Sequence, residues 1–327
     1  METTHDRTVR TPALLEEGQP FRQWRSWRIP GADCTLIGYS RANDKTFFHI
    51  PELKCCIDAG QCAGRRPDTV FLTHTHDDHV ADLEFLAGKP TGVDLYVPAA
   101  AVPYAERYIR ARRELNHVAP FNPELAAAFR LHPVSAGDQL SHGKRDAYRV
   151  RVFDCVHKVP CVGYAFDRRT TRLRGELAQL KDELVAAGRA REFGARLAEL
   201  RRRGEPVEEE RFEPLFAFVG DTHARVFARE PWLLEYPVII TECTFLDDAE
   251  KARAERVGHT LWSELEPVVT ANPNTTFVLI HFSLRHSDAE VIEHFERATR
   301  AAPAGALENL VIWASRDAAL PQQHQRR

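Results

Sequence analysis

Histidine and aspartate side chains crowd one short stretch, which reads "VFLTHTHDDHVADL" from residue 70 to 83. Imidazoles and carboxylates are zinc ligands with bond lengths of about 2.0–2.2 Å, and burying them without a partner is costly. A strand that ends at Thr73 and a helix that begins near Val80 would turn several of them toward one point. The stretch therefore predicts a metal site, with His74, His76, Asp78 and His79 as candidate ligands. Asp77 alternates away from this point, so we expect it outside the metal sphere.

More ligands are needed to complete two metal spheres, and three candidates stand where apolar runs stop. His157 follows "RVFDCV", Asp221 follows "LFAFVG" and His281 follows "TFVLI". Open α/β folds gather their sites at the carboxyl ends of strands. With the first loop these residues make seven ligands, enough for two zinc ions that share a bridging group.

This order of motifs resembles the metallo-β-lactamase superfamily and, within it, ribonuclease Z, the tRNA 3′-processing endonuclease. The pattern is His-x-His-x-Asp-His followed by a separate His, Asp and His. The resemblance covers roughly residues 33–286 and keeps the motif order. Beyond the first loop it is carried by "HKVPCVGYAF" (157–166), "GDT" (220–222), "ECTF" (242–245), "GHT" (258–260) and "IHFSLRH" (280–286).

The resemblance implies an α/β fold, a four-layer αββα sandwich, and a centre of two zinc ions per chain. Such a pair lowers the pKa of a bridging water and clamps a phosphodiester. One ion would take His74, His76 and His157, the other Asp78, His79 and His281, and Asp221 would bridge them.

Three residues are expected to carry the catalysis. Asp78 would also orient the water, and His259 would protonate the ribose 3′ oxygen that leaves. Glu242 would bond the other ring nitrogen of His259, which fixes its tautomer and raises its pKa. The pair Glu242 and His259 narrows the resemblance toward ribonuclease Z.

Two segments depart from the family pattern. "CIDAGQCAG" (56–64) stands where the family has a Gly-Asp-Gly-Thr turn. Residues 168–211, at the place of the family's tRNA-gripping arm, lack its Gly-Pro-rich tip and show helical leucine spacing instead. They predict an inserted helical hairpin, with twelve Lys and Arg against nine Asp and Glu, that is either a substrate arm or a solvated surface element.

Short apolar runs bounded by Gly, Pro, Asp or Asn predict the strands. Helical segments are expected at 101–115, 261–271 and 287–300, the last opened by a capping box of Ser287 and Glu290. We expect one hydrolase domain over 21–317, between a disordered arm (1–20) and a disordered tail (318–327). The predicted strands are 34–39, 46–50, 54–58, 69–73, 94–98, 148–156, 161–166, 215–220, 237–242, 276–281 and 309–314.

Composition limits the class of protein. A net charge of −3 excludes a polycation, so RNA binding would need a local basic patch. No run approaches about 18 apolar residues, which predicts no membrane span. Seven scattered cysteines without a C-x-x-C spacing favour reduced thiols in the cytoplasm.

Three functions are consistent with these residues. The first is a ribonuclease Z-like hydrolase whose partner is RNA (pre-tRNA), working as a homodimer. The second is a hydrolase of a small phosphodiester, a cyclic nucleotide or an ester, because one fold serves many substrates. The third, a non-catalytic binding subunit, is disfavoured because all seven ligands are present.

Overall fold

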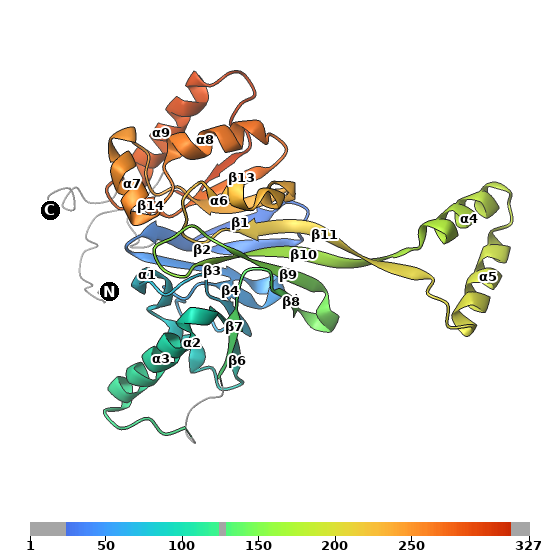
Figure 1. Ribbon diagram of the computed structural model, residues 1–327, viewed down its shortest axis with the longest axis horizontal. Coiled ribbons are helices and arrows are strands. Elements are labelled where there is room, and N and C mark those ends of the chain that lie inside the picture. The colour runs from blue at the N-terminus through green and yellow to red at the C-terminus, as the bar shows by residue number, and fades with distance from the viewer. Residues whose placement is uncertain (1–23, 124–128, 315–327) are drawn as a thin grey trace, which may run out of the picture.

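The computed structural model describes residues 24–123 and 129–314. The predicted disordered arm (1–20) and tail (318–327) lie outside the described residues. Two sheets pack face to face and helices cover both outer faces, while one long hairpin leaves the body (Figure 1). No helix in the described part of the chain combines the length and the apolar character that crossing a membrane requires.

The first sheet has the strand order β1-β2-β3-β4-β5-β6-β7, with β14 beside β2. Strands β1 to β4 pair antiparallel, and β4 to β7 pair parallel. Its strands are β1 (Arg25–Ile29), β2 (Cys34–Ala42), β3 (Lys45–Ile50), β4 (Cys55–Ile57), β5 (Thr69–Phe71), β6 (Val93–Pro98), β7 (Phe129–Val134) and β14 (Phe282–Ser283).

The second sheet has the order β15-β13-β12-β11-β10-β9-β8. Strands β8 to β11 pair antiparallel, and β11, β12, β13 and β15 pair parallel. Its strands are β8 (Gln139–His142), β9 (Tyr148–Asp154), β10 (Val162–Leu173), β11 (Glu208–Phe218), β12 (Val238–Glu242), β13 (Thr276–Ile280) and β15 (Leu310–Ile312).

The helices form the two outer layers. Helices α2 and α3 pack on the first sheet, and α6, α8 and α9 pack on the second. The capping box of Ser287 and Glu290 opens α9 as predicted. The helices are α1 (Asp77–Val80), α2 (Leu83–Ala87), α3 (Val102–His117), α4 (Gly175–Ala186), α5 (Ala190–Arg202), α6 (Val226–Arg229), α7 (Lys251–Val257), α8 (Trp262–Ala271) and α9 (Asp288–Ala301).

The core between the sheets is aromatic. Phe71 of the first sheet lies 5.4 Å from Phe166 of the second, edge to face, and Phe48 lies 5.5 Å from Phe218. Edge-to-face pairs add to the burial of apolar area, which is the main force that holds such layers together. The predicted four-layer αββα sandwich is confirmed by this arrangement.

Strand direction gathers the site at one edge of the molecule. Strands β5, β12 and β13 belong to parallel sets, and β9 and β11 run the same way because each pairs antiparallel with β10. The carboxyl ends of β5, β9, β11 and β13 are followed by the predicted ligand positions 74–79, 157, 221 and 281, and β12 ends at Glu242. The fold therefore brings to one edge segments that are far apart in the sequence.

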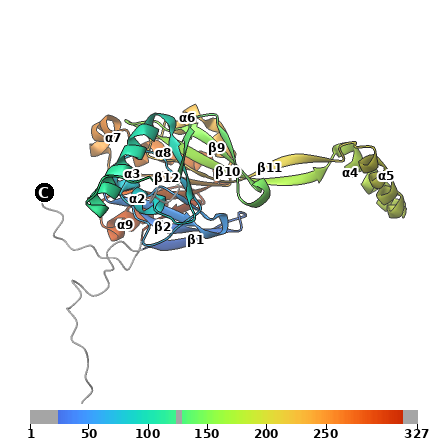
Figure 2. The ribbon, with the colours of Figure 1, turned by 90° about the horizontal axis from the view of Figure 1, so that it is seen from below.

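The predicted hairpin insertion projects away from the body in both views (Figures 1 and 2). Strands β10 and β11 continue out of the sheet as a two-stranded ribbon, and α4 and α5 form its tip. Gly188 and Gly204 have φ of +70° and +72° and follow the two helices. Glycine adopts this left-handed conformation without a Cβ penalty. We call residues 168–211 the arm.

Candidate metal centre

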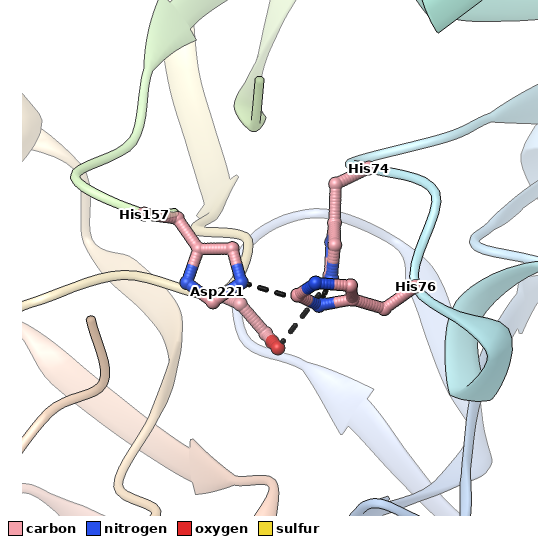
Figure 3. A group of neighbouring side chains, drawn as sticks. All are labelled: His74, His76, His157 and Asp221. Atoms are coloured by element: carbon pink, nitrogen blue, oxygen red, sulfur yellow. Dashed lines mark hydrogen bonds and ion pairs between the residues drawn. The ribbon is translucent and has the colours of Figure 1, made fainter. Parts of the chain in front are cut away.

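The seven predicted ligands lie together at the shared edge of the sheets. Within each of two groups, one ligand atom per residue lies within 4.8 Å of the others. Figure 3 shows the first group, in which His74 and His76 come from the loop after β5, His157 from the loop after β9 and Asp221 from the loop after β11. The first group is His74, His76, His157 and Asp221, and the second is Asp78, His79 and His281.

The spacing of the inward atoms suits metal coordination. His74 Nε2 lies 3.0 Å from His76 Nδ1, which lies 3.3 Å from His157 Nε2. In the second group His281 Nε2 lies 3.4 Å from His79 Nε2 and 3.4 Å from Asp78 Oδ2. Tetrahedral ligands at about 2.0–2.1 Å from zinc lie about 3.3 Å apart. The donor set and its spacing therefore fit a tetrahedral cation in each group.

Four of the histidines have their outward nitrogen occupied, which leaves Nε2 facing the centre. The Nδ1 partners are a hydroxyl, a carboxylate, a carbonyl and a second hydroxyl. Metal-binding histidines commonly donate the other N–H in this way, which fixes the tautomer. The pairs are His74 with Thr73 Oγ1 (3.0 Å), His79 with Asp58 Oδ2 (2.7 Å), His157 with Gly258 O (2.8 Å) and His281 with Thr244 Oγ1 (3.1 Å).

Asp58 is a supporting residue that the sequence analysis missed. It follows β4, is fully buried and has φ of +60°. Its Oδ1 accepts hydrogen bonds from the Thr73 N–H and hydroxyl at 2.8 Å, and its Oδ2 accepts one from His79. Asp58 therefore orients His79 directly and His74 through Thr73. A carboxylate directly after a buried strand was the signal that could have found it.

Asp221 lies between the two groups. Its Oδ2 is 3.6 Å from His74 Nε2 and 3.5 Å from both His79 Nε2 and His281 Nε2. Burial would raise the pKa of Asp221, but His281, His79 and His74 hold it well below its usual range. One carboxylate oxygen that faces both groups has the placement of a bridging ligand.

The cluster favours bound cations. Burial lowers the pKa of His74 and His157, which favours the neutral imidazole that ligation requires. For His79 burial is outweighed by the Asp221 and Asp58 carboxylates, which raise its pKa. These carboxylates stabilise a positive charge at this place, whether it is a proton or a metal ion.

Glu242 and His259 form a hydrogen-bonded pair beside the cluster. Glu242, 1% exposed at the end of β12, lies 2.7 Å from His259 Nδ1 through Oε1. The His259 ring stacks on His281 with centroids 5.5 Å apart and lies 4.9 Å from the His157 ring. Burial lowers the pKa of His259, but Glu242 outweighs it and raises this pKa to about 9. Asp221, His259 and His281 also lie close enough together to form a third candidate metal group.

Asp78 and Asp77 differ as the sequence led us to expect. Asp78 Oδ2 accepts a hydrogen bond from the Asn43 N–H at 3.0 Å and faces the second group. The Asp77 side chain is 85% exposed, and its carboxylate lies 3.6 Å from Lys45 Nζ. Gly60 fixes this loop, because a Cβ there would lie 1.9 Å from the backbone oxygen of Asp78.

Comparison with known proteins agrees with this geometry. Residues 59–190 match the Beta-lactamase superfamily domain. Over these residues the chain is similar to the metallo-β-lactamase superfamily. It is 28% identical over 293 residues to tRNase Z TRZ2, chloroplastic, of Arabidopsis thaliana, which covers 85% of this chain and 77% of that protein.

Two further relatives carry related names. The chain is 26% identical over 266 residues to tRNase Z TRZ1 of Arabidopsis thaliana, covering 78% of this chain and 88% of that protein. It is 29% identical over 249 residues to Ribonuclease Z of Nocardia farcinica, covering 69% and 75%. The predicted fold and the predicted resemblance to ribonuclease Z are confirmed, and with them the class of metal-dependent hydrolase.

Proposed function

We propose that this protein is a dinuclear-zinc phosphodiesterase of ribonuclease Z type that cuts pre-tRNA at its 3′ side. The observation that carries the proposal is the Glu242–His259 pair at 2.7 Å, placed against both ligand groups. The relatives named tRNase Z and Ribonuclease Z support the same reaction.

The ligand assignments follow the two groups. His74, His76 and His157 would hold one zinc, Asp78, His79 and His281 the other, and Asp221 both. When bound, the two ions supply Lewis-acid activation of a phosphate and of water. Asp78, with one oxygen fixed by the Asn43 N–H, would also orient the water for attack.

His259 is the proposed proton donor. Its Nδ1 is bonded to Glu242, so its Nε2 is the ring nitrogen left for substrate, and the ring lines the pocket beside the cluster. Cleavage between phosphorus and the ribose 3′ oxygen leaves a poor leaving group that needs a proton. Glu242 fixes the ring and stabilises its protonated form.

The arm supports a macromolecular substrate. It extends well beyond the body that holds the metal centre (Figures 1 and 2), so a small diester bound at that centre would not reach it. Eight of its twelve Lys and Arg side chains form ion pairs with carboxylates, so only part of its positive charge is exposed without a nearby negative charge. We name the four exposed ones without a carboxylate partner among the described residues the unpaired arm cations: Arg174, Lys181, Arg191 and Arg202.

The ion pairs also favour the second candidate function. Arg201 lies 2.9 Å from Glu208, and Arg189 lies 2.7 Å from Glu192, so these side chains would have to exchange partners to hold RNA phosphates. A small phosphodiester, a cyclic nucleotide or an ester would need only the metal centre. The two functions therefore make opposite predictions for RNA.

The test is incubation of zinc-loaded protein with a 3′-extended pre-tRNA, with bis(p-nitrophenyl) phosphate and cyclic nucleotides in parallel. We expect one cut in the pre-tRNA that leaves a 3′ hydroxyl on the tRNA and a 5′ phosphate on the trailer. The KM for RNA should rise steeply with salt, because phosphate contacts release counterions. Cleavage of the small substrates with an intact pre-tRNA would reject the tRNA-processing function.

Two other expectations belong to this proposal. A homodimer and a cytoplasmic location were expected from the sequence, and both stay predictions. Light scattering of the purified protein would test the first, and fractionation of cells that express the chain would test the second.

A further inference from the structure

The pocket beside the metal ligands contains positive charge that the proposed chemistry does not use. It has a volume of about 400 Å³ and is lined by His76, Asp78, Asp221, His259 and His281 together with other residues. Among its described lining residues two are Lys or Arg. They are Lys158, next in sequence to His157, and Arg253 in α7.

Helix α7 holds Arg253 over an aromatic ring. Ala254 is 1% exposed and packs with Phe245 and Leu261 in a small apolar cluster, which fixes the helix. The guanidinium carbon of Arg253 then lies 5.9 Å from the centre of the Phe245 ring. The same ring lies 6.4 Å from the ring of His259. Phe245 therefore has Arg253 and the proposed proton donor, His259, as neighbours.

Within residues 24–123 and 129–314, Arg253 has no carboxylate partner. It is half-buried, and no carboxylate of the described residues forms an ion pair with it, whereas Lys251 and Glu255 of the same helix do form ion pairs. A guanidinium offers five N–H donors in a planar fork that matches phosphate oxygens. Contact of the guanidinium with the face of the Phe245 ring leaves the N–H donors at the guanidinium edge available for a phosphate.

Lys158 adds a second positive charge at the same wall of the pocket. Its backbone nitrogen is 3.4 Å from where a Cβ on Gly258 would lie, so it sits beside the residue that follows α7. Its side chain is exposed and, within the described residues, also lacks a carboxylate partner. Both cations therefore line the pocket, Arg253 from α7 and Lys158 from the loop beside the end of that helix.

We propose that Arg253, assisted by Lys158, binds a second phosphate of a nucleotide chain, one nucleotide away from the phosphodiester held at the metal centre. The inference deepens the proposed function and rests on it. It defines the substrate class as a strand with consecutive phosphates rather than an isolated diester. Phe245 positions Arg253 and, at 4% exposure, is covered by it rather than open to a base.

The experiment compares two ligands on the zinc-loaded protein by titration calorimetry. Adenosine 3′,5′-bisphosphate carries both phosphates, and adenosine 5′-monophosphate carries one. We expect the wild type to bind the bisphosphate more tightly, and Arg253→Gln to lose about tenfold to a hundredfold for it, as expected for a charged hydrogen bond. The affinity of this variant for the monophosphate should fall much less.

Matched variants separate recognition from folding. Arg256→Gln removes an exposed cation of the same helix that does not line the pocket, and it should keep the wild-type preference. Arg253→Lys keeps the charge without the fork and should be intermediate, and Lys158→Gln should weaken the preference. Zinc content and circular dichroism are measured on every variant.

The outcomes distinguish this inference from the proposed function. A wild type without the preference, or an Arg253→Gln that keeps it, overturns the inference even if pre-tRNA is cut. If Arg253→Gln loses the preference for the bisphosphate but the wild type leaves pre-tRNA intact, tRNA processing is overturned. The subsite then stands, for another nucleotide substrate. Equal loss in Arg253→Gln and Arg256→Gln would mean general attraction by charge, which also rejects the subsite.

Discussion

Replacement of His259 by alanine separates proton donation from metal chemistry. The ribose 3′ oxygen is a poor leaving group, so loss of a positioned acid should lower kcat on pre-tRNA by about 10²–10⁴. p-Nitrophenolate leaves without a proton, so bis(p-nitrophenyl) phosphate should lose far less. Zinc content should stay near two per chain, because His259 is not an assigned ligand. It also makes none of the Nδ1 hydrogen bonds that orient the histidine ligands.

Replacement of Glu242 by glutamine is expected to destabilise the protein, although the two side chains have the same shape. Oε1 accepts from the Thr222 N–H at 2.7 Å and from His259, while Oε2 accepts from the Thr244 hydroxyl at 2.6 Å and the Thr260 N–H at 3.2 Å. An amide nitrogen cannot accept, so either orientation leaves at least one buried backbone N–H without a partner. Each such loss costs about 1–3 kcal/mol.

The stability loss gives Glu242→Gln a second readout. Against a typical total stability of about 5–15 kcal/mol, this loss should lower the melting temperature measurably. The His259 ring keeps an acceptor only if the glutamine oxygen stays on its side. The variant should therefore show the same substrate asymmetry as His259→Ala on a less stable protein.

The assay measures kcat on both substrates, zinc content and melting temperature for wild type, His259→Ala and Glu242→Gln. His294→Ala is the control, since this half-buried histidine of α9 does not line the metal pocket. Slowing of both substrates by the same factor in His259→Ala, with zinc retained, would refute the reasoning. His259 would then position the phosphate or support the loop.

Three further outcomes follow from the site and the arm. His76→Ala should lose zinc and activity together, and a folded wild type that takes up no zinc on reconstitution would contradict the metal centre. Gly60→Ala should lower the free energy of unfolding by about 1–3 kcal/mol and reduce zinc affinity through the Asp78 loop. Denaturation and metal titration measure the two values. Gly175→Ala is the control, because open space surrounds this glycine and neither value should change. Alanine at the four unpaired arm cations should weaken pre-tRNA binding and reduce its log–log salt slope by about 3, leaving the chromogenic diester unaffected; an unchanged slope would make the arm a surface element.

The buried strands were predictable because a buried strand requires a run of apolar residues in the sequence. Each of the predicted apolar runs overlaps a strand, including "TFVLI" with β13 and "PVIITE" with β12. The strands without such runs were missed. Arg25–Ile29 and Phe129–Val134 are the outer strands of the first sheet, and Gln139–His142 is an outer strand of the second. Edge strands carry charges and proline because one side faces solvent, so no apolar run marks them.

The site was predictable where chemistry depends on residue type and not where it depends on contacts. The predicted ligands follow strand ends, a rule that needs only the order of elements. Asp58 and Thr244 act through hydrogen bonds to His79 and His281, and nothing in their spacing along the chain indicates those partners. A strand-end position can mark such a residue as a candidate, as it does Asp58, but the ligand it supports becomes known only when the fold brings the two together.

The arm shows how counting charges can mislead while periodicity succeeds. Leucine spacing predicted two helices, and α4 and α5 lie where it placed them. The excess of basic residues left a substrate arm open, but Arg196 pairs with Glu199 and Arg211 with Glu209 within the arm itself. The carboxylates of these pairs cancel part of the local positive potential that would attract a phosphate. Binding of RNA by the arm therefore depends on where the unpaired arm cations lie, and net charge alone is a poor measure of it.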